Sequence, residues 1–285
     1  MNVGTENART ESTRTEHVRT EHVRTEHVRT EISGAGVASV LLCRTAKRNA
    51  LDRAMLEELR TAVERLAAHP GLRAVVVRGE RGVFSAGADI ADWAAPAPEE
   101  AEALARLGQE TFDALADLPV PTVAVVEGCA LGGGLELALA CDLRIAAADA
   151  LLGLPELGLG NLPSWGGTAR LADIAGLGVA RHLLLSGELV DGARAASLLV
   201  VTSAHPAGEV DAAVGAAVDR LLAAEPRALA LAKRVLRELR SESSLEAVLA
   251  AYTAGLASSR TRKQEFVERR RARRAARTGT AEEAS

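Results

Sequence analysis

The stretch GCALGGGLE at residues 128–136 decides the fold. It follows the apolar run Thr122–Val126, which is typical of a strand buried on both faces. Consecutive glycines let the backbone turn sharply, and a helix beginning at about Gly133 directs its free N–H groups and its dipole at that turn. Such a turn favours an anion, either a phosphate or a developing oxyanion.

The alternation of strands and helices extends on both sides of this turn. Val37–Cys43, Ala74–Val77 and Leu143–Ala147 read as further strands. Residues 52–68 have helical periodicity, with one apolar face made by Met55, Leu56, Leu59, Val63 and Leu66. Strands that alternate with helices predict an α/β fold with a mostly parallel sheet. From residue 209 onward the pattern is helical, with helices predicted over 210–223, 226–240, 245–258 and 262–277.

Composition excludes several classes of protein. The chain has 285 residues, of which 48% are hydrophobic, so it can bury a large core, and the scarcity of aromatics means that this core is built from Ala, Val and Leu. A net charge of −4 indicates neither nucleic acid nor a membrane as the main partner. The three cysteines, Cys43, Cys129 and Cys141, have no spacing typical of a disulfide framework or a zinc site. The N-terminus has no apolar stretch, so we expect a cytoplasmic protein without signal peptide or anchor.

The first 27 residues are polar and repetitive. The unit RTEHV occurs at residues 14–18, 19–23 and 24–28, and it places His17, His22 and His27 five residues apart. The repeat has two interpretations, a metal-binding histidine tract or a solvated tail. A spacing of five residues places the histidines on neither one helix face nor one strand face. We therefore expect a disordered tail over residues 1–27, with the last copy of the repeat leading into a first strand near Ile32, and no metal site.

A second glycine-containing loop and two glutamates point to chemistry. The loop is FSAGAD at residues 84–89, and the glutamates are Glu136 and Glu156, both among apolar residues. Neither loop is a phosphate loop, because no Lys follows the glycines, and the dinucleotide fingerprint is absent. A carboxylate among apolar side chains is costly unless it is paired or has a raised pKa. The pair is therefore a candidate general acid and base, and the alternative is two structural carboxylates, one of them at a helix N-terminus.

Several motifs in order resemble the crotonase (enoyl-CoA hydratase/isomerase) superfamily. They are SAGAD at 85–89, ALGGGLE at 130–136, Pro155-Glu156, and PSWGGTARL at 163–171, and the resemblance runs from about residue 31 to residue 271. It implies a spiral of ββα units over residues 28–208 and a helical C-terminal region over 209–285 that forms trimers and covers the CoA. The implied partners are an acyl-CoA thioester and other copies of the chain in a homotrimer or hexamer. No cofactor is implied, because CoA is part of the substrate.

The resemblance also implies roles for single residues. The backbone N–H groups of Ala86 and Gly133 would form an oxyanion hole, Glu156 would protonate Cα, and Glu136 would hold and activate the water. The implied contacts to the CoA and acyl parts of the substrate are Lys47, Arg48, Ala50, Ala86, Ala88, Asp89, Ile90, Trp93, Gly132, Ser164, Trp165, Phe266 and Arg269. Ser164 and Trp165 stand where this family usually has small residues, and with Trp93 they indicate either plain packing or a narrowed, aromatic-accepting pocket.

Glutamate at both positions favours an enoyl-CoA hydratase. The alternatives within the superfamily are a Δ3,Δ2-enoyl-CoA isomerase and a specialised acyl-CoA dehydratase of secondary metabolism. Two alternatives belong to other classes of function. The basic segment at residues 260–277 could bind RNA, although no aromatic residues interleave with its arginines. A non-catalytic scaffold would have no need for two costly carboxyls.

Overall fold

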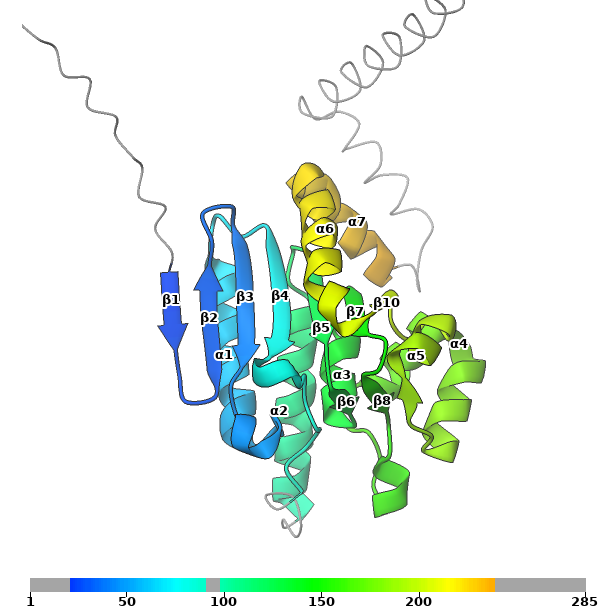
Figure 1. Ribbon diagram of the computed structural model, residues 1–285. Coiled ribbons are helices and arrows are strands. Elements are labelled where there is room, and N and C mark those ends of the chain that lie inside the picture. Colours follow the sequence, from blue (N-terminus) through cyan, green and yellow to red (C-terminus); the bar gives the residue numbers. More distant parts are fainter. Residues whose placement is uncertain (1–20, 91–97, 239–285) are drawn as a thin grey trace, which may run out of the picture.

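The computed structural model describes residues 21–90 and 98–238, and its main element is a seven-stranded sheet (Figure 1). The strand order is β1-β2-β3-β4-β5-β7-β10. The first three strands are antiparallel, and β3, β4, β5, β7 and β10 are parallel neighbours. The strands are β1 (Glu21–Arg24), β2 (Val28–Ile32), β3 (Val37–Leu42), β4 (Ala74–Gly79), β5 (Thr122–Val126), β7 (Leu143–Ala147) and β10 (Ser203–His205). The predicted α/β class and mostly parallel sheet are confirmed.

A smaller sheet lies beside the large one and carries the glycine-rich turn. Its order is β6-β8-β9, with bounds Cys129–Leu131, Leu151–Gly153 and Val190–Asp191. β6 leads directly into α3 (Gly133–Leu139), every residue of which is buried. Gly132, between them, has φ +50, and its N–H donates to the Gly153 carbonyl at 2.9 Å. This positive φ is the reason for a glycine at the strand-to-helix turn.

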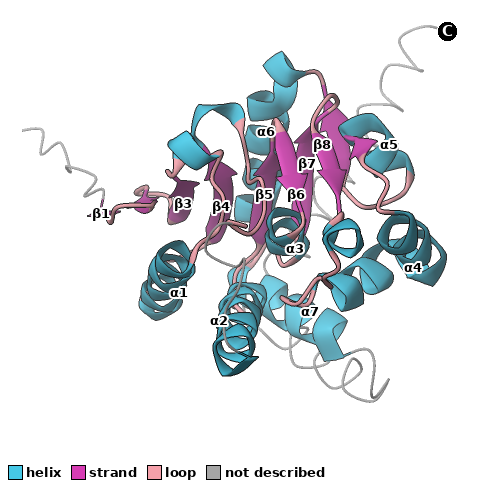
Figure 2. Cartoon of the chain, turned by 90° about the horizontal axis from the view of Figure 1, so that it is seen from below, coloured by secondary structure: helices cyan, strands magenta, loops and turns pink. Residues whose placement is uncertain are grey.

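Helices cover both faces of the large sheet. α1 (Arg53–Ala68) and α2 (Pro98–Ala116) lie on one side, and α6 (Val210–Ala223) lies on the other (Figure 2). α1 buries the apolar face that the periodicity predicts, and the Asp52 carboxylate caps its N-terminus by accepting from the Met55 N–H. Between these layers, all five residues of β5 are buried.

The remaining helices follow the small sheet and the last strands. They are α4 (Gly167–Ser186), α5 (Gly192–Ser197) and α7 (Pro226–Glu238), with short 3-10 turns η1 (Thr45–Lys47), η2 (Glu80–Gly82), η3 (Glu156–Leu159) and η4 (Ala207–Glu209). The helix expected over 210–223 is confirmed, and that over 226–240 is confirmed as far as Glu238. The helices expected over 245–258 and 262–277 lie outside the described residues. None of the helices within residues 21–90 and 98–238 combines the length and the hydropathy that a membrane-spanning segment requires.

Two of the predicted domain boundaries differ from the packing. The expectation of a disordered tail over residues 1–27 is wrong for its last part, because β1 pairs antiparallel with β2, Glu21 opposite Ile32. The Glu58 carboxylate of α1 fixes the turn after β1, since it accepts from the backbone N–H groups of His27 and Val28 at 2.8 and 3.0 Å. At the other boundary, α6 buries Val210, Val214 and Ala217 in the main core, so the helical C-terminal region begins with a helix of that core.

Candidate active site

Glu136 lies in the first turn of α3 and is 2% exposed. Its Oε1 accepts hydrogen bonds from two backbone N–H groups at the start of α4, those of Trp165 at 2.9 Å and Gly167 at 2.8 Å. Burial raises the pKa of this carboxyl to about 7, and the charge of Glu156 adds to the rise, while the two N–H donors and Arg170 oppose it. A carboxyl group with this pKa can accept or donate a proton near neutral pH.

Glu156 is the first residue of η3, and its carboxyl lies against the glycine-rich turn. A Cβ added at Gly132 would lie 2.6 Å from Glu156 Oε1. Burial also raises the pKa of Glu156, against a hydrogen bond from its own backbone N–H. Its Oε2 is buried without a hydrogen-bond partner in the described part of the chain. The two predicted glutamates are therefore brought together at the start of α3, each in the desolvated setting that an acid/base pair needs.

The backbone donors beside this pair differ from the predicted ones. The Ala86 N–H donates to the Arg48 carbonyl at 3.0 Å, so the prediction of Ala86 as an oxyanion donor does not fit the structure. Ala88, two residues further on, donates no backbone hydrogen bond within the described residues. A Cβ added at Gly87 would lie 3.6 Å from the Gly133 nitrogen, so this loop runs alongside the first turn of α3. The Gly133 N–H, as the first of the helix, has no partner within α3.

The residues predicted to contact CoA meet the same loop. Leu51 forms a parallel bridge with Ala88, and this bridge joins the turn that carries Lys47, Arg48 and Ala50 to residues 86–89. The Lys47 ammonium lies 3.8 Å from the Asp89 carboxylate, and its side chain is 55% exposed. Arg48 has φ 52 and its guanidinium donates to Cys129 Sγ at 3.3 Å. Ala50 is buried.

The remaining residues predicted to contact the substrate differ in their exposure. The Asp89 carboxylate is buried and pairs with the Arg44 guanidinium at 2.7 Å, which indicates a structural role in fixing the loop rather than a direct contact to substrate. Ile90, just beyond it, is 63% exposed, and Ser164 is exposed as well. Three of the predicted contacts, Trp93, Phe266 and Arg269, lie outside the described residues.

Trp165 is a packing residue. Its side chain is buried, and its ring meets the Phe112 ring edge-on, with centroids 5.5 Å apart and an interplanar angle of 87°. Of the two readings that the sequence left open, the structure favours packing between α2 and α3. Whether the ring also narrows the acyl pocket stays a prediction.

Sequence reasoning missed Arg170, which fixes the loop that holds Glu136. Its guanidinium donates to the Trp165 carbonyl at 2.8 Å and pairs with Asp113 of α2 at 2.5 Å. In the sequence, Arg170 stands out only as one residue of the motif PSWGGTARL, in the first turn of the helix that begins at Gly167.

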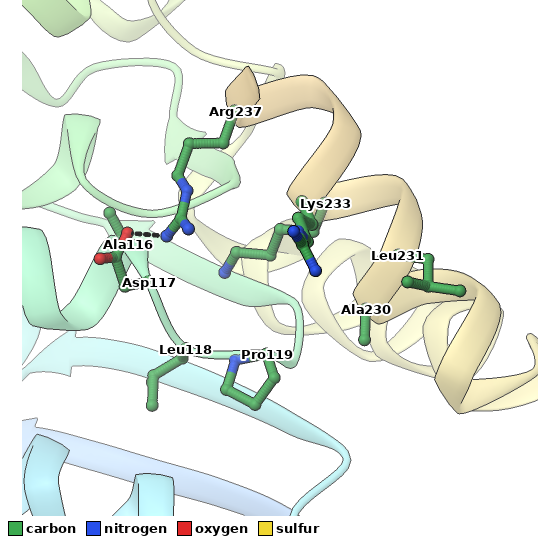
Figure 3. Close-up of a pocket in the computed structure, with 9 residues that line it drawn as sticks. Ala116, Asp117, Leu118, Pro119, Ala230, Leu231, Lys233 and Arg237 are labelled. Carbon is green, nitrogen blue, oxygen red and sulfur yellow. Dashed lines mark hydrogen bonds and ion pairs between the residues drawn. The ribbon is translucent and has the colours of Figure 1, made fainter. Parts of the chain in front are cut away.

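A pocket lies apart from these residues, between the end of α2 and α7 (Figure 3). It is lined by Ala116–Pro119 and by one face of α7 that includes Lys233 and Arg237. Lys233 pairs with Asp142 at 2.7 Å and Arg237 pairs with Asp117. Since these two cations already have acidic partners, nothing here indicates a ligand.

A mostly parallel sheet with helices on both faces, a smaller second sheet, and two carboxyls at a glycine-rich strand-to-helix turn define a protein of the crotonase class. The family model described as enoyl-CoA hydratase/isomerase matches residues 33–274. The chain belongs to this family.

Several of the similar proteins are named as hydratases. A probable enoyl-CoA hydratase of Bacillus subtilis is 40% identical over 194 residues, which are 67% of this chain and 75% of that protein. The mitochondrial methylglutaconyl-CoA hydratase of Mus musculus is 36% identical over 208 residues, 71% of this chain and 66% of that protein. The crystal structure of an enoyl-CoA hydratase from Bacillus anthracis matches with a TM-score of 0.78 at 28% identity, covering 88% of this chain and 96% of that one.

Proposed function

We propose that this chain is an enoyl-CoA hydratase that adds water reversibly across the α,β-double bond of an acyl-CoA thioester. One observation carries the proposal: the buried Glu136 carboxyl and the half-buried Glu156 carboxyl, both with raised pKa values, meet beside two backbone N–H groups that have no partner among the described residues. Hydration needs a base for the water, an acid for Cα and donors for the thioester oxygen. The hydratases among its relatives favour this reaction over the isomerase alternative.

The backbone donors act on the thioester carbonyl. The Ala88 and Gly133 N–H groups donate to its oxygen and stabilise the negative charge that develops there when water attacks Cβ. The α3 dipole, whose positive end lies at Gly133, adds to this stabilisation. Because both donors are fixed by the backbone, they need no reorganisation during the reaction.

The two carboxyls divide the proton transfers. Glu136 in its ionised form accepts a proton from water as the water oxygen bonds to Cβ. Glu156 in its protonated form gives a proton to Cα as the enolate collapses. The two carboxyls then return to their starting states by exchanging one proton through water, so one water molecule is consumed in each turnover. Dehydration is the same sequence reversed.

The turn 47–50 with the loop 86–90 is the proposed contact surface for CoA. The exposed Lys47 ammonium beside this loop supports the proposal, because CoA carries phosphates. We propose no cofactor and no metal, since the two carboxyls and the backbone donors supply all the groups that this reaction needs.

We propose that the chain forms a homotrimer or a hexamer. Exposed leucines support it: Leu177 and Leu185 of α4 are 54% and 71% exposed, and Leu199 after α5 is 67% exposed. A trimer or hexamer would give a molar mass three or six times that of the chain in light scattering. A cytoplasmic location stays a prediction.

The test of the function is the loss of enoyl-thioester absorbance from crotonyl-CoA and cinnamoyl-CoA. Wild type is expected to turn over at least one of them, and Glu136→Gln and Glu156→Gln are each expected to lose at least about a thousandfold in kcat. A matched control is Glu188→Gln, because Glu188 is exposed and pairs with His182 instead of facing the site. Turnover that survives both substitutions would exclude the two-carboxyl mechanism.

A further inference from the structure

One residue, Trp165, touches both halves of the proposed site. Its backbone N–H donates to Glu136 Oε1 at 2.9 Å. Its ring lies against Gly133, where an added Cβ would be 2.1 Å from the ring atom Cζ3. Trp165 therefore contacts the Glu136 carboxyl through its backbone N–H and the proposed oxyanion donor, Gly133, through its ring.

The opposite edge of the same ring rests on α2. A Cβ added at Gly108 would lie 2.3 Å from Nε1 and 2.4 Å from Cδ1 of the ring. The indole is thus wedged between a glycine of α2 and a glycine of α3, and neither site has room for a methyl group. At its main chain, the Trp165 carbonyl accepts from Arg170, which also pairs with Asp113 of α2.

We propose that Trp165 is a positioning residue, whose ring fixes the Glu136 carboxyl and the Gly133 N–H relative to each other by bracing both against Gly108 of α2. This inference rests on the proposed function for its kinetic part, and it also makes a claim about Glu136 that holds without turnover. Displacing the ring displaces the Trp165 N–H, and Glu136 then loses one of its two donors.

The charged groups around Glu136 determine how the loss of this hydrogen bond changes its pKa. Glu156 faces it from η3, Arg170 faces it from α4, and Asp113 of α2 acts on it through Arg170. Glu156 raises the pKa of Glu136, whereas Arg170 and the N–H groups of Trp165 and Gly167 lower it. Weakening the Trp165 hydrogen bond therefore raises the pKa of Glu136 above its wild-type value.

The substitution that tests the wedge is Gly108→Ala. Alanine has a higher helix propensity than glycine, so a lower kcat would not result from a weaker α2 helix. We expect kcat to fall between about 10- and 100-fold because small displacements of reacting groups are costly. KM should stay within about threefold, because the binding surface for CoA is untouched. Gly215→Ala in α6 is the matched control, since an added Cβ there meets nothing within 4 Å.

A second substitution completes a double-mutant cycle. Trp165→Phe removes the outer ring atoms that press on Gly133, and the smaller ring can shift away from an added methyl at position 108. Trp165→Phe should itself lower kcat, and Gly108→Ala should lower kcat much less in the Trp165→Phe background than in wild type. A cost of Gly108→Ala that is equally large in both backgrounds would overturn the wedge, and so would a Gly108→Ala enzyme with the kcat of the control.

A readout without substrate separates this inference from the proposed function. Infrared difference titration, with Glu136→Gln as the blank, measures the protonated carboxyl band of Glu136. The titration midpoint should move upward in Gly108→Ala and stay unchanged in Gly215→Ala. If wild type hydrates no enoyl-CoA yet the midpoint moves, the proposed function fails and the positioning role stands. An unmoved midpoint in a folded Gly108→Ala protein contradicts the positioning role, whatever the activity.

Discussion

The N–H of Gly167 donates to Oε1 of Glu136 at 2.8 Å, and this bond joins the first turn of α4 to the first turn of α3. The same carboxyl is buried, and its pKa is raised to about 7 although it accepts two such bonds. Desolvation therefore outweighs hydrogen bonding at this site. The predictions that follow depend on that balance and on the groups around it.

The pH dependence of turnover should report Glu136. A base must be ionised, so kcat/KM should fall as the pH drops below about 7, and at pH 5 it should be about a hundredfold lower than its plateau. Initial rates with crotonyl-CoA from pH 5 to 9 measure this limb. A limb near 4.5, the ordinary value of a glutamate, would contradict the assignment of Glu136 as the base.

Glu136 should also make the protein less stable at higher pH. Its folded pKa is raised, so its favourable contribution is fully present below about pH 4.5 and is lost as the pH rises through about 7. Glu136→Gln cannot ionise, and its stability relative to wild type should therefore increase by about 2 kcal/mol between pH 5 and pH 8. Urea unfolding of both proteins at the two pH values measures this, and an unchanged difference would mean that the carboxyl is not desolvated.

Gly132→Ala should disable Glu156. The new Cβ would lie 2.6 Å from Glu156 Oε1, and φ +50 adds backbone strain. We expect kcat to fall by about a hundredfold or more as the carboxyl is pushed from its place. Gly158→Ala, in η3 itself, is the control because an added Cβ there meets nothing within 4 Å. Equal activity of the two variants would argue against a role for the Glu156 position.

Replacing single amides by esters should separate Ala88 from Ala86. An ester at Ala88 removes an N–H that has no protein acceptor among the described residues, so kcat should fall by about a hundredfold with little loss of stability. An ester at Ala86 removes the donor to the Arg48 carbonyl and should cost about 1 kcal/mol of stability while sparing kcat. Steady-state kinetics and thermal unfolding of the two proteins measure this, and the reverse pattern would restore Ala86 as the oxyanion donor.

The sequence predicts the parts of this fold that local patterns determine. α1 follows from the cap at Asp52 and from one apolar face, and β5 follows from an uninterrupted apolar run. The start of α3 at Gly133 follows from the glycines before it. β1 could not be predicted in this way, because its polar repeat becomes a strand only through pairing with β2.

The site shows the limit of the same reasoning. Glu136 and Glu156 stand out in the sequence as carboxyls among apolar residues. Their meeting at Gly132 depends on tertiary packing that no local pattern encodes. Similarly, a motif identifies the loop 85–89, but it does not tell which of its N–H groups is already hydrogen-bonded. The role of Trp165 depends on its contact with Gly108, and nothing in the sequence distinguishes this glycine of α2.

The most direct test of the central claim is NMR of crotonyl-CoA incubated with wild-type enzyme in D2O. We expect a 3-hydroxyacyl-CoA product that carries oxygen from the solvent at C3 and one deuterium at C2, and we expect no such product with Glu136→Gln or Glu156→Gln. A wild-type enzyme that moves the double bond of an enoyl-CoA, or exchanges deuterium, without adding oxygen at C3 would contradict that claim.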